Sequence, residues 1–225
     1  MSQGPLPVGG NPDDWVVSRP GGGVSELLAA DPVIDGRRVL IHEMDGPALV
    51  LGSAQRRAPE AAVPAGMELV RRRSGGGAVL LRPGDVVWVD VLLPRGDPLW
   101  VDDVGRSTWW LGDVWSAALG DLGLTTAVHR GPMVSTRWSD RVCFAGVGPG
   151  EVLLEGRKVV GISQRRDRLG SRFQCAALLR WAVSEMVGLF DLSPADEAAR
   201  ELQGAAAGLP VDGETLVAAV LNRLP

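Results

Sequence analysis

The chain has 225 residues and a formal net charge of −4, from 23 basic and 27 acidic side chains. Hydrophobic residues make up 45% of it, enough for one fairly large domain with a buried core. An acidic balance argues against general nucleic-acid binding, and no apolar run reaches the roughly 20 residues that cross a bilayer. The opening MSQGPLPVGG lacks the features of a secretory signal, and two cysteines lie far apart. We therefore expect a cytoplasmic protein with reduced thiols and no nucleic-acid or membrane partner.

The first third of the chain predicts a tail, a helix and several strands. Residues 1–14 consist largely of Gly, Pro, Asn and Asp and read as a flexible tail. A short helix is expected at 24–31. Runs of β-branched and apolar residues bounded by Gly or Pro predict strands, at 37–44, 47–55 and 66–73.

The rest of the chain predicts a hairpin, a helix and further strands, followed by helices near the C-terminus. Apolar residues around Pro83-Gly84-Asp85 predict a hairpin over 78–94, and three- to four-residue apolar spacing predicts a helix over 99–120. Further strands are expected at 125–128, 142–145 and 173–181, a hairpin at 151–164 around Glu155-Gly156, and helices at 193–210 and 212–224. Antiparallel strands with segregated helices predict an α+β fold, with a central mixed or antiparallel sheet flanked by helices.

The basic residues contain one anomaly. Of the 23, only Lys158 is a lysine, in the segment EGRKVVGISQRR. Arginine replaces lysine easily at solvated positions, but not where chemistry needs a compact ammonium. A position that keeps its lysine therefore suggests a catalytic role, although a lysine surviving by chance explains the count equally well.

A second segment, VRRRSGGGAV, places three glycines after a predicted strand. Glycines let the backbone approach a ligand, and successive N–H groups can form an anion-binding nest. The segment is not a Walker loop, because no Gly-Lys-Ser/Thr follows. A plain glycine-rich turn is the ordinary alternative.

Taken together, these segments resemble a known family. VRRRSGGGAV resembles the arginine–serine–glycine signature of lipoate–protein ligases, and EGRKVVGISQRR resembles the Gly-Arg-Lys hairpin that carries their catalytic lysine. WSDRVCFAG stands where that family has an Asn-Asp-type segment. The resemblance covers roughly residues 45 to 180. It places a catalytic domain at 15–190, followed by short helices at 191–225 with no accessory domain, which a separate subunit could supply.

The resemblance implies an ATP-dependent ligase. Lipoate or octanoate would be activated as an acyl-adenylate with ATP and Mg²⁺, then passed to a lysine of a lipoyl domain, in a 2-oxoacid dehydrogenase E2 or the glycine-cleavage H protein. Lys158 would be catalytic, and no metal site made by the protein alone is expected. The implied substrate- and cofactor-binding residues are Arg71, Arg72, Ser74, Gly75, Gly76, Gly77, Ala78, Asp140, Gly161 and Ser163.

Two alternatives stay open. In one branch of the wider biotin/lipoate ligase and octanoyltransferase superfamily, a cysteine shortly before the hairpin forms a thioester, and Cys143 stands fifteen residues before Lys158. Such a transferase needs no ATP and could take its acyl group from acyl carrier protein, although a buried structural cysteine is also common. Alternatively, the domain has drifted to bind an acyl group or nucleotide without turnover. The family's histidines are replaced here, at Leu80-Leu81-Arg82 and at Cys175-Ala176.

Overall fold

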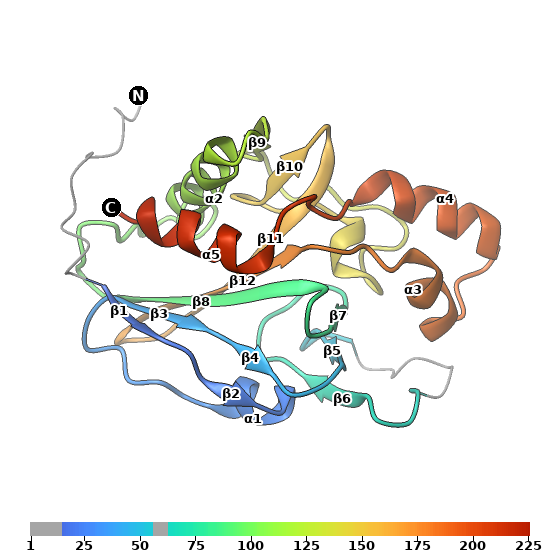
Figure 1. The fold of residues 1–225 in the computed structure, drawn as a ribbon, viewed down its shortest axis with the longest axis horizontal. Helices are drawn as coiled ribbons and strands as arrows, with labels where there is room; N and C mark the ends of the chain where they lie inside the picture. The colour runs from blue at the N-terminus through green and yellow to red at the C-terminus, as the bar shows by residue number, and fades with distance from the viewer. Residues whose placement is uncertain (1–14, 56–62) are drawn as a thin grey trace.

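The computed structural model describes residues 15–55 and 63–225, so the tail predicted at 1–14 lies outside the described residues. Its strands form one seven-stranded mixed sheet, a three-stranded sheet and a two-stranded one, and helices surround them (Figure 1). The α+β prediction is confirmed. None of the helices in the described ranges is both long and apolar enough to span a membrane.

The seven-stranded sheet carries the main core. Its strands, in spatial order, are β1 (Val16–Ser18), β3 (Arg38–Ile41), β8 (Val86–Pro94), β12 (Gly170–Leu178), β11 (Arg157–Arg166), β10 (Val152–Leu154) and β9 (Thr126–Val128). Helices α2 (Trp109–Asp121) and α5 (Gly213–Asn222) lie side by side against it (Figure 1). Alternate β8 residues, Val87 and Val89 among them, pack into the same core as Trp115 and Val220 of these helices. One face of the sheet is thereby sealed.

The smaller sheets lie toward the other face. The three-stranded sheet has the order β6 (Glu68–Arg71), β5 (Ala48–Leu51) and β7 (Val79–Leu81), and β2 (Gly21–Gly22) pairs with β4 (Glu43–Met44). Helix α1 (Val24–Ala29) shares a core with Val50 and with Trp88 of β8. Helices α3 (Val183–Leu189) and α4 (Ala195–Ala205) pack on the three-stranded sheet. The two larger sheets therefore face each other.

The hairpin predicted at 151–164 is confirmed. Strands β10 and β11 pair antiparallel, and the turn residues Glu155 and Gly156 have φ angles of 52° and 79°. Positive φ at both central positions characterises the tight turns whose twist matches that of antiparallel strands. The helices expected near the C-terminus are also present as α4 and α5, and α3 was not expected.

Three local predictions are wrong. The segment 78–94 turns as expected but is no hairpin, because β7 pairs with β5 whereas β8 pairs with β3 and β12. Apart from Asp90 in β8, both strands are apolar and buried on both faces, so their pattern does not specify a partner. The helix expected over 99–120 begins only at Trp109, and residues 142–145 form a short 3₁₀ turn, η2 (Cys143–Ala145), rather than a strand. Short apolar runs do not distinguish a strand from a buried turn.

Candidate active site

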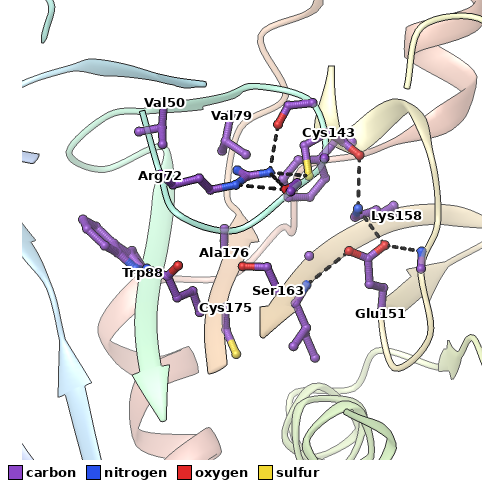
Figure 2. A pocket seen from close by; sticks show the side chains of 18 of the residues that line it. Val50, Arg72, Val79, Trp88, Cys143, Glu151, Lys158, Ser163, Cys175 and Ala176 are labelled. Atoms are coloured by element: carbon purple, nitrogen blue, oxygen red, sulfur yellow. Dashed lines mark hydrogen bonds and ion pairs between the residues drawn. The ribbon is translucent and has the colours of Figure 1, made fainter. Parts of the chain in front are cut away.

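A cavity of about 200 Å³ lies between the seven-stranded and three-stranded sheets. Val50 and Val79 contribute from the smaller sheet, and Trp88 and Ala176 from the larger one (Figure 2). The lining is mostly apolar, and its charged members are Arg72, Glu151 and Lys158. The lining residues are Leu28, Val50, Arg72, Gly75, Gly76, Gly77, Val79, Leu81, Trp88, Met133, Ser139, Cys143, Phe144, Gly148, Glu151, Lys158, Gly161, Ile162, Ser163, Gln174, Cys175 and Ala176.

Arg72 organises the glycine loop that follows β6. Its buried guanidinium donates to the carbonyl oxygens of Gly75, at 2.7 Å, and Gly77, at 2.9 Å. Both bonds come from Nη2, and Nε adds a contact of 3.3 Å to the Gly75 carbonyl, so two nitrogens of the planar guanidinium hold the loop. The loop is therefore held by a side chain from its own start.

The three glycines differ in what they require. A Cβ on Gly77 would lie 2.6 Å from the Ser139 carbonyl oxygen and 2.7 Å from the Cys143 backbone nitrogen, so no side chain fits. Gly76 has a φ of +91°, which favours glycine. Gly75 has open space around its Cα. The absence of a side chain on Gly77 thus lets the glycine loop contact the backbone of residues 139–143.

Lys158 lies in the cavity wall and is 1% exposed. Its Nζ is 2.7 Å from Oε2 of Glu151 and donates to the carbonyl oxygens of Gly146, at 3.1 Å, and Cys143, at 3.2 Å (Figure 2). Its ammonium also lies 4.8 Å from the ring centre of Phe144. The predicted catalytic lysine is therefore buried at the cavity, and its backbone partners lie in and beside η2.

Glu151 was not among the sequence-predicted site residues. It lies directly before β10, on the hairpin that carries Lys158, and it lines the cavity. Its position in the sequence could have revealed it. An acid that directly precedes the apolar run 152–154 is well placed to face the other strand of the same hairpin. The sequence interpretation had instead singled out Asp140, which is exposed and is not a lining residue.

The two cysteines have different environments. Cys143 is half-buried at the cavity, and its Sγ accepts a long contact of 3.7 Å from the Arg72 guanidinium. Cys175 also borders the cavity, but its sulfur points away from the glycine loop into the main core (Figure 2). Burial raises the pKa of the Cys175 thiol well above its usual range, so this thiol stays protonated.

Most of the remaining predicted residues lie at or beside the cavity. Ser74 and Ser163 place their hydroxyl oxygens 3.3 Å apart and join the glycine loop to β11. A Cβ on Gly161 would lie 3.2 Å from Cε of Lys158. Ala78 is buried behind the loop, where its carbonyl accepts from the Cys143 backbone nitrogen. Arg71 is exposed and donates to the Gly52 carbonyl.

A family model described as "Lipoyl protein ligase A/B catalytic domain" matches residues 26–208, which is most of the chain. The chain belongs to the lipoyl protein ligase A/B catalytic domain family. It is an enzyme domain of the lipoate ligase or octanoyltransferase type. The comparison with curated proteins found no match.

Solved structures of this family share the fold. A bipartite lipoate protein ligase from Thermoplasma acidophilum, solved with its E2 lipoyl domain, superposes with a TM-score of 0.68 at 14% identity, covering 93% of this chain and 80% of that one. Lipoate-protein ligase A bound with ATP gives 0.65 at 14% identity, covering 93% and 82%. LipL1 of P. falciparum, in complex with lipoate, gives 0.57 at 11% identity, covering 93% and 61%.

Some of the positions at which the resemblance implies histidines lie at the cavity. Leu81, Cys175 and Ala176 line it, whereas Leu80 and Arg82 do not. The three lining positions carry apolar side chains or a protonated thiol. Lys158 and Glu151 supply an ion pair in the same wall.

Proposed function

We propose that this protein activates lipoate or octanoate as an acyl-adenylate and transfers the acyl group to a lysine of a lipoyl-domain protein. The observation that carries the proposal is the buried Lys158 ammonium in the wall of a mostly apolar cavity. A mostly apolar cavity suits a hydrocarbon chain, and a fixed cation in its wall suits the oxygens of the chain's carboxylate.

The proposed chemistry has two steps. A carboxylate oxygen attacks the α-phosphorus of ATP, so that an acyl–O–P bond forms and pyrophosphate leaves. The acceptor amine then attacks the acyl carbon, loses a proton, and AMP leaves with the bonding electrons. Lys158 would stabilise the negative charge that develops on the carboxylate and phosphate oxygens. The glycine loop at Gly75–Gly77 would bring backbone close to those oxygens, and Mg²⁺ would enter with ATP.

The remaining predicted ligands fit this proposal unequally. Ser74, Ser163 and Gly161 lie beside Lys158 or the glycine loop and could contact the acyl-adenylate. Arg71 and Asp140 are exposed, so either could contact ATP–Mg²⁺ only from outside the cavity. We place the acceptor among lipoyl domains, of the E2 or glycine-cleavage H type. The bipartite organisation of the T. acidophilum ligase makes a separate accessory subunit a reasonable further partner.

The test is a mass measurement. The protein is mixed with lipoate, ATP–Mg²⁺ and an apo lipoyl domain, and the acceptor is examined for the lipoyl mass shift. A shift that needs ATP supports the proposal. Absence of a shift, with and without candidate accessory subunits, contradicts it.

The position of Cys143 favours a second candidate. Its sulfur lies at the cavity beside Arg72, and nucleophilic cysteines commonly lie near such cations. In this mechanism the Cys143 sulfur would attack the thioester of acyl carrier protein and release its thiol. The acceptor amine would then take the acyl group from Cys143. Acyl transfer from octanoyl-carrier protein without ATP, abolished in Cys143→Ala, would select this mechanism.

A non-catalytic outcome is distinguishable from both. Calorimetric binding of lipoate or octanoate with no product in either assay would show that the cavity binds an acyl group only. The intact Lys158 in the cavity wall argues against this outcome, because an apolar acyl pocket alone does not require a buried amine.

A further inference from the structure

The buried ion pair between Lys158 and Glu151 is unusually isolated from solvent. The two side chains are 1% and 7% exposed, and their Nζ and Oε2 atoms are 2.7 Å apart. Removing charges from water is costly, and a buried pair is stable only when its geometry is good and its remaining polar atoms are satisfied. Here backbone groups satisfy the remaining polar atoms of both side chains.

The Glu151 carboxylate is anchored on both oxygens. Oε2 accepts from the Gly148 backbone nitrogen at 2.6 Å, and Oε1 accepts from the Ile162 backbone nitrogen at 3.2 Å. Gly148 lies in the loop after η2, whereas Ile162 lies within β11 beyond Lys158. The carboxylate is therefore fixed by two segments, one on each side of the lysine.

The Lys158 ammonium has no donor left over in this arrangement. An ammonium has three N–H groups, and Nζ has three acceptors within 3.2 Å, from Glu151, Gly146 and Cys143. A substrate oxygen can bind Nζ only by replacing one of them. The Glu151 contact is the shortest and is charge-assisted, so a neutral backbone carbonyl is the partner that gives way.

We infer that Glu151 is a positioning residue of the active site, which keeps the Lys158 amine charged in the buried wall and fixes it where substrate oxygens replace a backbone carbonyl. This inference rests on the proposed function for the identity of the substrate, but not for the charge and place of the amine. It applies to the adenylate and the thioester mechanism alike, because both develop negative charge on an acyl oxygen.

The chain offers a direct readout of this role, because Lys158 is its only lysine. Protein labelled with ¹³C at the lysine ε position gives one side-chain resonance, whose chemical shift reports the charge of one amine. In Glu151→Gln, the ammonium has no counter-ion in its buried site, so the neutral amine is favoured. We therefore expect the resonance of this variant to differ from that of the native protein at the same neutral pH, and to move toward the position of a neutral amine.

The rate of acyl transfer should depend on the charge of the Lys158 amine. We expect Glu151→Gln to lose about 10–100-fold in rate near neutral pH, the loss typical when a hydrogen-bonding group that orients a metal-binding side chain is removed. The rate should recover as the pH is lowered, because protonation restores the ammonium. A pair retained only for folding would change stability without producing this pH-dependent recovery.

Two further variants complete the test. Glu155→Gln removes an exposed acid from the turn of the same hairpin and should match the native protein in resonance and rate. Glu151→Asp keeps the charge but shortens the side chain, so its resonance should stay at the ammonium position while the rate falls. It also decides the outcome if Glu151→Gln does not fold, since a native rate and pH profile in Glu151→Asp would overturn the inference.

The inference and the proposed function fail differently. A Glu151→Gln resonance and pH profile identical to those of the native protein would overturn the role of Glu151, whatever reaction the enzyme performs. Absence of product in both acyl-transfer assays would remove the proposed function. The resonance alone would then decide whether Glu151 holds the amine charged.

Discussion

Arg72 and Cys143 are 71 positions apart in the sequence, yet a guanidinium nitrogen of Arg72 lies 3.7 Å from the Cys143 sulfur. The same guanidinium nitrogen binds the carbonyl oxygens of Gly75 and Gly77. The carbonyl of Cys143 in turn accepts from Lys158. One short chain of contacts therefore connects the glycine loop, η2 and the lysine hairpin, and a change in any of these segments is expected to affect the others.

Lys158→Arg tests the need for a compact ammonium. The side chain is fully enclosed, and a larger planar guanidinium cannot keep the contacts to Glu151 and two carbonyls in the same space. We expect a loss on the order of 10²-fold in acyl transfer, the usual effect of removing one charge-stabilising donor. Arg157→Lys, a conservative change in the same hairpin, is the control. A native rate in Lys158→Arg would refute our explanation of the single lysine.

Arg72→Lys tests how the glycine loop is held. Lysine keeps the charge but has only one nitrogen, so it loses the Nε contact to the Gly75 carbonyl and the fixed planar geometry, and we expect a loss of about 1–3 kcal/mol in the free energy of unfolding. Urea unfolding measures it. Arg73→Lys changes the exposed neighbour and should stay within about 0.5 kcal/mol of the native value. Equal stability of the two variants would show that the loop does not depend on Arg72.

Alanine substitutions should rank the three glycines. Gly77→Ala forces a Cβ against the backbone of residues 139–143 and should cost about 1–3 kcal/mol of stability, measured by urea unfolding. Gly75→Ala meets open space and should be close to neutral. Gly76→Ala should be intermediate, because its φ is positive but its nearest neighbour is the end of the Arg72 side chain. The reverse order would mean that the loop closes differently.

Glu68 should make stability depend on pH. Its carboxylate accepts from the backbone nitrogens of Val24 and Ser25 at the start of α1, and hydrogen bonds from Ser25 lower the pKa of Glu68. A lowered pKa in the folded state contributes stability above the unfolded pKa, about 4.3, which is lost as the pH falls through the folded value. Thermal unfolding should therefore show native protein and Glu68→Gln converging at acid pH. A constant difference would contradict this.

Lysines placed next to cavity-lining residues should accept an acyl group. Arg73 follows the lining residue Arg72, Arg165 stands two positions after the lining residue Ser163 in β11, and both pair with the exposed Asp31. We call these two positions the rim. The native chain offers an activated acyl group no exposed lysine. Under the proposed function, Arg73→Lys and Arg165→Lys should become acylated with lipoate and ATP, as seen by peptide mass.

Arg223→Lys, beyond the end of α5 on the far side of the sheet, is the matched control for the rim variants and should stay unmodified. Equal labelling at all three positions would indicate diffusion of the activated acyl group into solution instead of capture at the rim.

The sequence predicted those features that depend on neighbouring residues. The turn at Glu155-Gly156, the strands on either side of it and the C-terminal helices were all predicted, because turn chemistry and apolar spacing act over a few positions. The lysine hairpin and the glycine loop were recognisable as motifs for the same reason. The partners of the strands were not predictable. Apart from Asp90, β7 and β8 are apolar on both faces, and they adjoin the same turn but enter different sheets.

By itself, then, the sequence determined the α+β class, the family and the candidate catalytic lysine, because composition and short motifs are enough to recognise them. Only the tertiary structure decided that Glu151, not Asp140, is the acid at the cavity, and that Cys143 rather than Cys175 has a thiol available there. Segments that are 70 or more positions apart in the sequence come close together only when the sheets pack. Burial and charge pairing, which set the chemistry of these side chains, exist only after that packing has formed.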